Sequence, residues 1–155
     1  MLKINSTAHG TVIIDREIFI DASPETVFGF LVDPALMAHW IGIMHSLDAR
    51  PGGLFKVEVS RGNVARGTYT EVKPPHRVAF TWGWESDDPT LALAPPGTSF
   101  VEIELEPKGG GTLLRLRHSR LPSATQTIHG DRWSFYLGRL QAALRDRYHR
   151  SIGLS

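Results

Sequence analysis

A change of hydrophobic period near residue 122 constrains the fold of this chain more than any other feature of its sequence. Upstream, residues 101–106 alternate between apolar and acidic side chains, three glycines follow, and residues 112–118 continue as a return strand. Downstream, apolar residues follow a helical spacing at Trp133, Leu137, Leu140, Leu144 and Tyr148. The sequence therefore predicts a β-hairpin followed by one long helix, from about residue 125 to 148.

The N-terminal part predicts one strand and a bent pair of short helices. Residues 11–20 are rich in β-branched side chains, and their apolar face is interrupted by Arg16. Ser-Pro-Glu at residues 23–25 is typical of a helix start. The Asp-Pro pair at 33–34 should end that helix and begin a second one toward Trp40, because the residue before a proline resists the helical conformation.

The middle of the chain predicts the remaining strands. Period-two alternation covers residues 55–60, 65–72 and 78–84 before the hairpin already described, which makes six strands in all. An antiparallel sheet with its helices gathered on one side is an α+β architecture. We expect one domain covering residues 1–155, with its core at about 11–148. A strongly curved sheet around one helix need not pack solid, so a ligand pocket is expected at its mouth.

Composition narrows the functional classes. The 155 residues carry a net charge of +1 and no cysteine, which excludes thiol chemistry and gives no reason to expect nucleic acid as a partner. His39 and His45 lack a carboxylate at ligand spacing, so we predict no metal site. The N-terminus does not resemble a secretory signal, and no apolar run approaches the ~20 residues that span a bilayer. We therefore expect a cytoplasmic protein without stable membrane insertion.

A series of short motifs resembles a known superfamily. The motifs are IFIDASPETVF at 18–28, Asp-Pro at 33–34, PGGLF at 51–55, EVKPPHRV at 71–78, GTLL at 111–114, and Trp133 with Leu137 and Leu140. Over about residues 11–147 the chain resembles the START-like (SRPBCC) superfamily, and within it the branch named for the activator of Hsp90 ATPase homologue 1 (AHSA1). The resemblance implies a helix-grip (Bet v 1-like) fold, in which a curved six-stranded sheet wraps around a long C-terminal helix. Arg132 stands where this branch normally has Gly, and Phe28 where it has Trp.

The resemblance also implies a hydrophobic or amphipathic small molecule held between the long helix and the sheet. Three aromatic residues on one parity, Phe80, Trp82 and Trp84, would suit a flat apolar ligand, although packing of a solid core explains the same pattern. The expected ligand-binding residues are Trp40, Phe55, Tyr69, Phe80, Trp82, Trp84, Ile103, Leu116, His118, Trp133 and Leu137.

Polar residues on otherwise apolar faces are candidates for the lining of the cavity. His118 shares the parity of Leu116, and Tyr69 shares that of Glu71, although the alternation in 65–72 leaves open which parity faces inward. Arg16 and Glu71 are the further candidates. Each would need a partner if it faced inward, because burial of an unpaired charge is costly, and surface exposure is the alternative for both.

Three functions remain open at this stage. We expect binding of a hydrophobic small molecule, which requires neither a catalytic residue nor a cofactor. The alternatives are a cyclase- or hydrolase-type enzyme that uses His118 or Glu71 as a general base, and a co-chaperone-like module that docks an Hsp90-like chaperone or a second copy of the chain.

Overall fold

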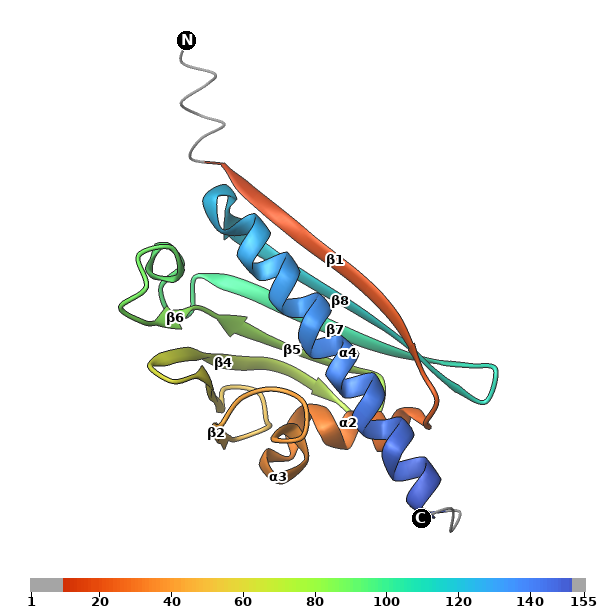
Figure 1. Ribbon diagram of the computed structural model, residues 1–155. Coiled ribbons are helices and arrows are strands. Elements are labelled where there is room, and N and C mark those ends of the chain that lie inside the picture. Colours follow the sequence, from red (N-terminus) through yellow and green to blue (C-terminus); the bar gives the residue numbers. More distant parts are fainter. Residues whose placement is uncertain (1–9, 152–155) are drawn as a thin grey trace.

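The computed structural model describes residues 10–151, with side chains up to residue 146. In chain order (Figure 1), its elements are β1 (Thr11–Ile20), α2 (Pro24–Val32), α3 (Pro34–Met37), β2 (Met44–Leu47), β3 (Leu54–Ser60), β4 (Asn63–Lys73), β5 (Arg77–Trp82), β6 (Trp84–Glu85), η1 (Leu91–Leu93), β7 (Ser99–Lys108), β8 (Gly111–Pro122), η2 (Ser123–Thr125) and α4 (Gln126–Ser151). The sheet thus has two more strands than the six predicted. The strand β2 is too short to show a period, and β6 contains Trp84, which was expected to continue the strand of β5.

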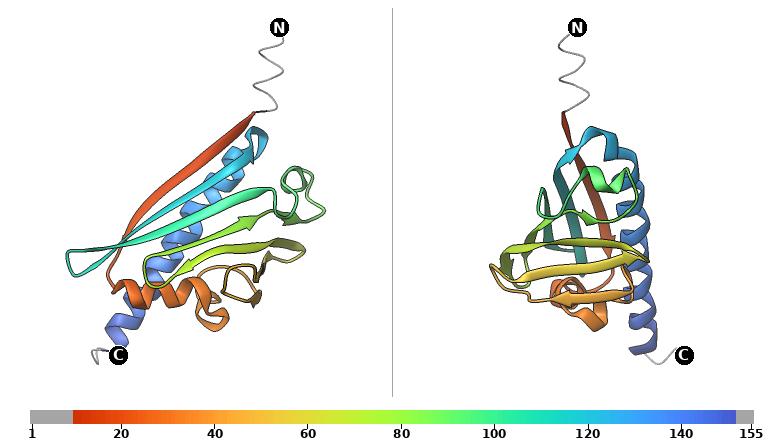
Figure 2. Two further views of the ribbon diagram at one scale, coloured as in Figure 1. Left: turned by 180° about the vertical axis from the view of Figure 1, so that it is seen from behind. Right: turned by 90° about the vertical axis from the view of Figure 1, so that its left-hand side faces the viewer.

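The strands form one antiparallel sheet that curves around one side of α4. Their order is β1-β8-β7-β5-β4-β3-β2, and β6 pairs with β4 beside this path. α4 crosses one face of the sheet diagonally, with α2 and α3 near one end, and the other face stays uncovered (Figure 1, Figure 2). This arrangement confirms the predicted α+β, helix-grip architecture.

The bend between the two short helices forms as the sequence predicts. Ser23 caps α2 by accepting a hydrogen bond from the backbone N–H of Thr26 at 3.2 Å. Asp33 is extended, so it ends α2, and its Oδ1 accepts from the backbone N–H of Ala35 at 2.8 Å to begin α3. The second helix is shorter than expected, and Trp40 lies in the turns that follow it.

The expected strand 78–84 is divided at Gly83, and this corrects the sequence-based boundary. A Cβ atom at Gly83 would overlap the backbone carbonyl of Pro95, so only glycine allows the two segments to approach this closely. β5 therefore ends at Trp82, while Trp84 turns to pair with Ala65 of β4. The Trp84 backbone N–H also donates to the carbonyl of Ala94 at 2.7 Å.

The two faces of the sheet differ sharply in polarity. On the uncovered face, Glu102 pairs with Arg117 and Glu104 with Arg115 in the β7–β8 register. On the covered face, α4 buries Trp133, Leu137, Leu140 and Leu144 against the sheet, as the helical spacing predicts. Tyr148, the last member of that stripe, lies outside the side chains that the structure describes. Among residues 10–151, no helix is long and apolar enough to cross a membrane.

Candidate functional site

Six aromatic side chains meet between the sheet and α4. They are Phe55, Tyr69, Phe80, Trp82, Trp84 and Trp133, and each is at most 4% exposed. Phe55 stacks on Phe80 with ring centroids 4.0 Å apart. Trp82 lies 5.3 Å from both Trp84 and Trp133. The sequence-predicted aromatic residues are therefore brought together in one cluster.

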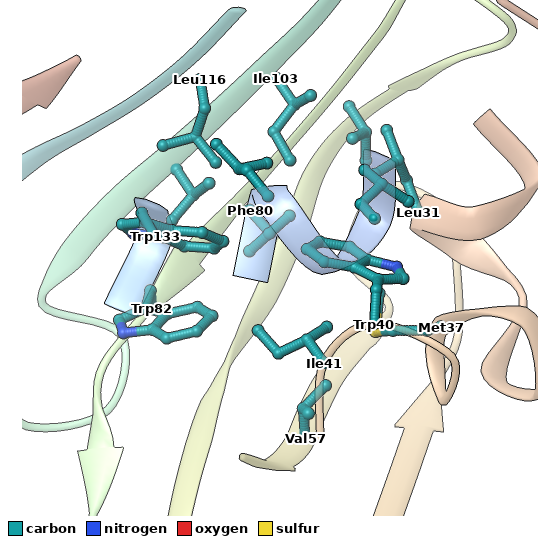
Figure 3. Packing of buried hydrophobic residues seen from close by; sticks show 14 of the residues in the cluster. Leu31, Met37, Trp40, Ile41, Val57, Phe80, Trp82, Ile103, Leu116 and Trp133 are labelled. Atoms are coloured by element: carbon teal, nitrogen blue, oxygen red, sulfur yellow. The ribbon is translucent and has the colours of Figure 1, made fainter. Parts of the chain in front are cut away.

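Two small cavities adjoin this cluster, each with a volume of about 10 Å³. The α3 cavity is lined by Leu31, Met37, Trp40, Ile41, Phe55, Phe80, Trp82, Ile103 and Trp133. The α4 cavity is lined by Ile41, Val59, Trp82, Trp84, His129, Arg132, Trp133 and Tyr136. Ile41, Trp82 and Trp133 belong to both walls, and Figure 3 shows them near Trp40. Each cavity has room for about one water molecule, so side chains fill most of the expected pocket.

His118 is fully buried and both of its ring nitrogens are occupied. Trp133 Nε1 donates to His118 Nδ1 at 2.9 Å, which makes Nδ1 an acceptor. Ser99 Oγ donates to the Trp82 carbonyl at 2.8 Å and lies 2.8 Å from His118 Nε2. Nε2 must therefore carry the proton and donate to Ser99, which leaves His118 neutral with no free lone pair.

His129 repeats this arrangement on α4 and was missed by the sequence analysis. Trp84 Nε1 donates to His129 Nε2 at 2.9 Å, and Nδ1 lies 3.0 Å from the carbonyl of Thr125. The proton therefore sits on Nδ1. The rings of His118 and His129 are 5.1 Å apart. The available signal was the position of His129 four residues before Trp133, which places both on one helix face.

Burial holds both imidazoles in the neutral form. Loss of hydration lowers the pKa of His118 well below its usual value, and nearby His129 adds to the effect. Burial also lowers the pKa of His129; its bond to the Thr125 carbonyl opposes this and the charge of Arg132 supports it.

Two buried polar atoms near the cavities have no hydrogen-bond partner among the described residues: Tyr69 Oη and Trp82 Nε1. Burial, assisted by Asp48, raises the pKa of Tyr69 well above its usual value, so its hydroxyl remains protonated. Both groups can donate a hydrogen bond. Trp82 lines both cavities, whereas Tyr69 lines neither.

Arg132 lies at the edge of the α4 cavity. Its guanidinium carbon is 5.7 Å from the centre of the Trp84 ring, in a cation–π contact. Arg132 and Tyr136 are partly exposed members of the cavity wall. The α4 cavity therefore reaches the surface at a cationic side chain.

Neither cavity is lined by the predicted residues Leu116, His118, Leu137 and Arg16. Leu116 and Leu137 are buried in the core. Arg16 connects β1 to α4 through hydrogen bonds. Arg16 Nε donates to Ser134 Oγ at 2.9 Å and Nη2 donates to the Gly130 carbonyl at 3.2 Å. Arg16 thus faces the helix, as its parity predicts, with a structural contact at the edge of the sheet.

Glu71 lies on the uncovered face of the sheet, which corrects the expectation that it shares the face of Tyr69. The β4–β5 register shifts between Tyr69 and Glu71, and this irregularity turns Glu71 outward. There Glu71 pairs with Lys73 at 2.7 Å and with Arg77 at 2.6 Å. These hydrogen bonds lower the pKa of Glu71.

The uncovered face also carries a charged hollow of about 600 Å³. The arginine and carboxylate side chains that line this hollow form ion pairs with one another. Arg77 contacts Glu102 at 2.8 Å and Glu104 at 3.2 Å, and Arg117 contacts Asp15 at 3.1 Å. Within the described residues, no group of three or more His, Asp or Glu side chains is placed to hold a metal ion.

The comparisons place this geometry in a family. A family model described as activator of Hsp90 ATPase homolog 1-like protein (AHSA1) matches residues 21–145. The chain belongs to this family. A comparison of the AHSA1-like chain with curated proteins finds no match.

Solved structures similar to the AHSA1-like chain share its fold. An AHSA1-like protein from Rhizobium etli is 43% identical, with a TM-score of 0.66, over 85% of this chain and 81% of its own. CalU16 from Micromonospora echinospora is 28% identical, with a TM-score of 0.66, over 90% of this chain and 79% of its own. The Aha1 dimer from Colwellia psychrerythraea is 23% identical, with a TM-score of 0.70, over 86% of this chain and 96% of its own. That last likeness concerns the fold alone.

Proposed function

We propose that the AHSA1-like chain binds a hydrophobic or amphipathic small molecule between the sheet and α4. The observation that carries this proposal is Trp82, which lines both cavities and whose indole N–H is buried without an acceptor among the described residues. A buried donor without a partner costs about 1–3 kcal/mol. A ligand that supplies an acceptor recovers this energy, and its apolar surface contributes ~25 cal/mol for each Å² removed from water.

Entry of such a ligand requires the two cavities to join. They are separated by Ile41, Trp82 and Trp133, and Ile41 lies in the non-helical segment between α3 and β2. A short connecting segment moves more easily than a helix or a central strand. Displacement of Ile41 is therefore the simplest way to form one larger pocket.

The proposal is tested with a neutral apolar dye, N-phenyl-1-naphthylamine, whose fluorescence rises in an apolar site. We expect Ile41→Ala to bind the dye more tightly than the wild type, because it enlarges both cavities, and Ile41→Phe to bind it weakly, because it fills them. Ile43→Phe is the matched control, since Ile43 is 60% exposed, and it should bind like the wild type. Equal dye binding by all four proteins would contradict the proposal.

An enzymatic function that uses His118 or Glu71 as a general base has less support. Both nitrogens of His118 are engaged, so it has no lone pair for a substrate proton, and Glu71 lies on the far side of the sheet. A protein-docking function has no single surface in its favour. Among the described residues, the exposed large apolar side chains are spread over several elements, including Phe19 on β1, Met44 on β2 and Phe135 on α4.

A further inference from the structure

The α4 cavity exposes apolar surface, and the unused hydrogen-bonding capacity of the residues around it belongs to a donor. Within the described part of the chain, Trp82 Nε1–H has no acceptor, while the acceptor nitrogen of His129 is taken by Trp84. The described residues of the cavity wall include no aspartate or glutamate. A ligand that enters here meets apolar surface, and it meets no carboxylate of the described residues that would attract a cation.

Arg132 adds a positive charge to this wall. Among the described residues it has no carboxylate partner, in contrast to the paired arginines of the uncovered sheet face. Its charged group is held by the Trp84 ring at 5.7 Å, beside the cavity. A guanidinium that is partly shielded from water and lacks a counter-ion binds carboxylates through charge-assisted hydrogen bonds.

We propose that the ligand is an amphipathic carboxylic acid, bound with its apolar part between Trp82 and Trp133 and its carboxylate on Arg132. This inference rests on the proposed function, because it assigns the head group of the same ligand. Arg132 is then the residue that determines specificity for an anion. An alcohol with the same tail lacks the charge, and the corresponding amine is repelled.

The experiment compares three probes with one tail: octanoate, 1-octanol and octylamine. Calorimetric titration at neutral pH measures their binding to the wild type, to Arg132→Gln and to Arg139→Gln. Arg139 is the matched control, because it lies on the solvent side of α4 with its guanidinium 5.9 Å from the Phe135 ring. Thermal unfolding of each variant checks that it is folded.

We expect the wild type and Arg139→Gln to bind octanoate at least about tenfold more tightly than 1-octanol, with octylamine the weakest. Arg132→Gln should lose this preference and keep its affinity for 1-octanol. Equal affinities for octanoate and 1-octanol in the wild type, or an unchanged preference in Arg132→Gln, would overturn the carboxylate inference. Either result leaves the proposed function standing. Failure of the neutral dye and of all three octyl compounds to bind would overturn both.

Discussion

Trp133 and Trp84 each donate their indole N–H to a buried histidine, and these two contacts define the polar part of the core. The donors fix the tautomers of His118 and His129, since each accepting nitrogen must be unprotonated. A buried histidine often indicates chemistry, but here the rings serve as hydrogen-bond acceptors for aromatic side chains. The parity of residues 114–118 was sufficient to predict that His118 faces inward, whereas its partners come from elements distant in sequence.

Trp133→Phe and Trp82→Phe form a matched pair at the residue scale. Both remove an indole ring from the same cluster, but only Trp133→Phe leaves an acceptor, His118 Nδ1, unpaired. We expect Trp133→Phe to lower the free energy of unfolding by about 1–3 kcal/mol more than Trp82→Phe does. Urea unfolding of the two variants measures the difference, and equal losses would show that the His118 contact contributes nothing.

At the element scale, the short helices and the strand β6 show two different origins of local structure. The break between α2 and α3 follows from Asp33 and Pro34 themselves, because capping and the restriction before proline act over a few residues. The separation of β6 from β5 depends on Pro95, twelve residues beyond Gly83. Only the first of these could be predicted from the sequence.

Asp33→Ala tests the role of this residue as the cap of α3. The variant loses the hydrogen bond that the Ala35 N–H donates to Asp33 Oδ1, so we expect the free energy of unfolding to fall by about 0.5–2 kcal/mol. Asp21→Ala is the control, because Asp21 is exposed outside any helix, and its effect should stay within about 0.5 kcal/mol. Chemical denaturation measures both, and a similar effect of the two changes would contradict the capping role.

At the scale of the whole molecule, α4 is attached to the edge of the sheet by polar contacts as well as by its apolar stripe. Arg16 on β1 bonds to Ser134 and Gly130, and Gln141 Nε2 donates to the Phe19 carbonyl at 2.7 Å. On the uncovered sheet face, the ion pairs of Arg115 and Arg117 are instead more than half exposed, and such pairs contribute little to stability. Substitution of arginines on the two faces of the sheet should therefore lower the stability of the protein by different amounts.

Arg16→Met should destabilise the protein more than Arg117→Met. Arg16 loses side-chain bonds that join two elements, for which we expect about 1 kcal/mol. Arg117 loses one ion pair to Asp15 in which both side chains are more than half exposed, and the expected change is at most about 0.5 kcal/mol. Thermal and urea unfolding measure the loss of stability in both variants. A larger loss in Arg117→Met would show that the attachment of α4 to the sheet does not depend on Arg16.

Stability should fall as the pH drops below about 6.5, the ordinary pKa of histidine. Because burial lowers the pKa of His118 and His129 in the folded state, the unfolded chain binds more protons in this range, and each residue can cost up to ~1.4 kcal/mol per pH unit. The lowered pKa of Glu71 acts only at lower pH, below the value of about 4.5 that an unperturbed glutamate has.

Urea unfolding at about pH 7.5 and about pH 5.5 measures this loss. His129→Gln should reduce it, since glutamine can still accept from Trp84 and does not titrate. His76→Gln, a change at an exposed histidine, should leave it unaltered. A wild type that is equally stable at both pH values would contradict the assignment of neutral, buried imidazoles.

The sequence by itself determined the order of the main elements, the inward parity of Trp82 and His118, and the charged outer rows of the β7–β8 hairpin. These features follow from hydrophobic period and capping, which act between near neighbours along the chain. The tertiary structure alone decided that Glu71 faces outward, that Arg132 lies over Trp84, and that side chains fill most of the cavity. Each of these depends on contacts between distant segments, because a register shift, a cation–π contact and a void are set by how elements pack against one another.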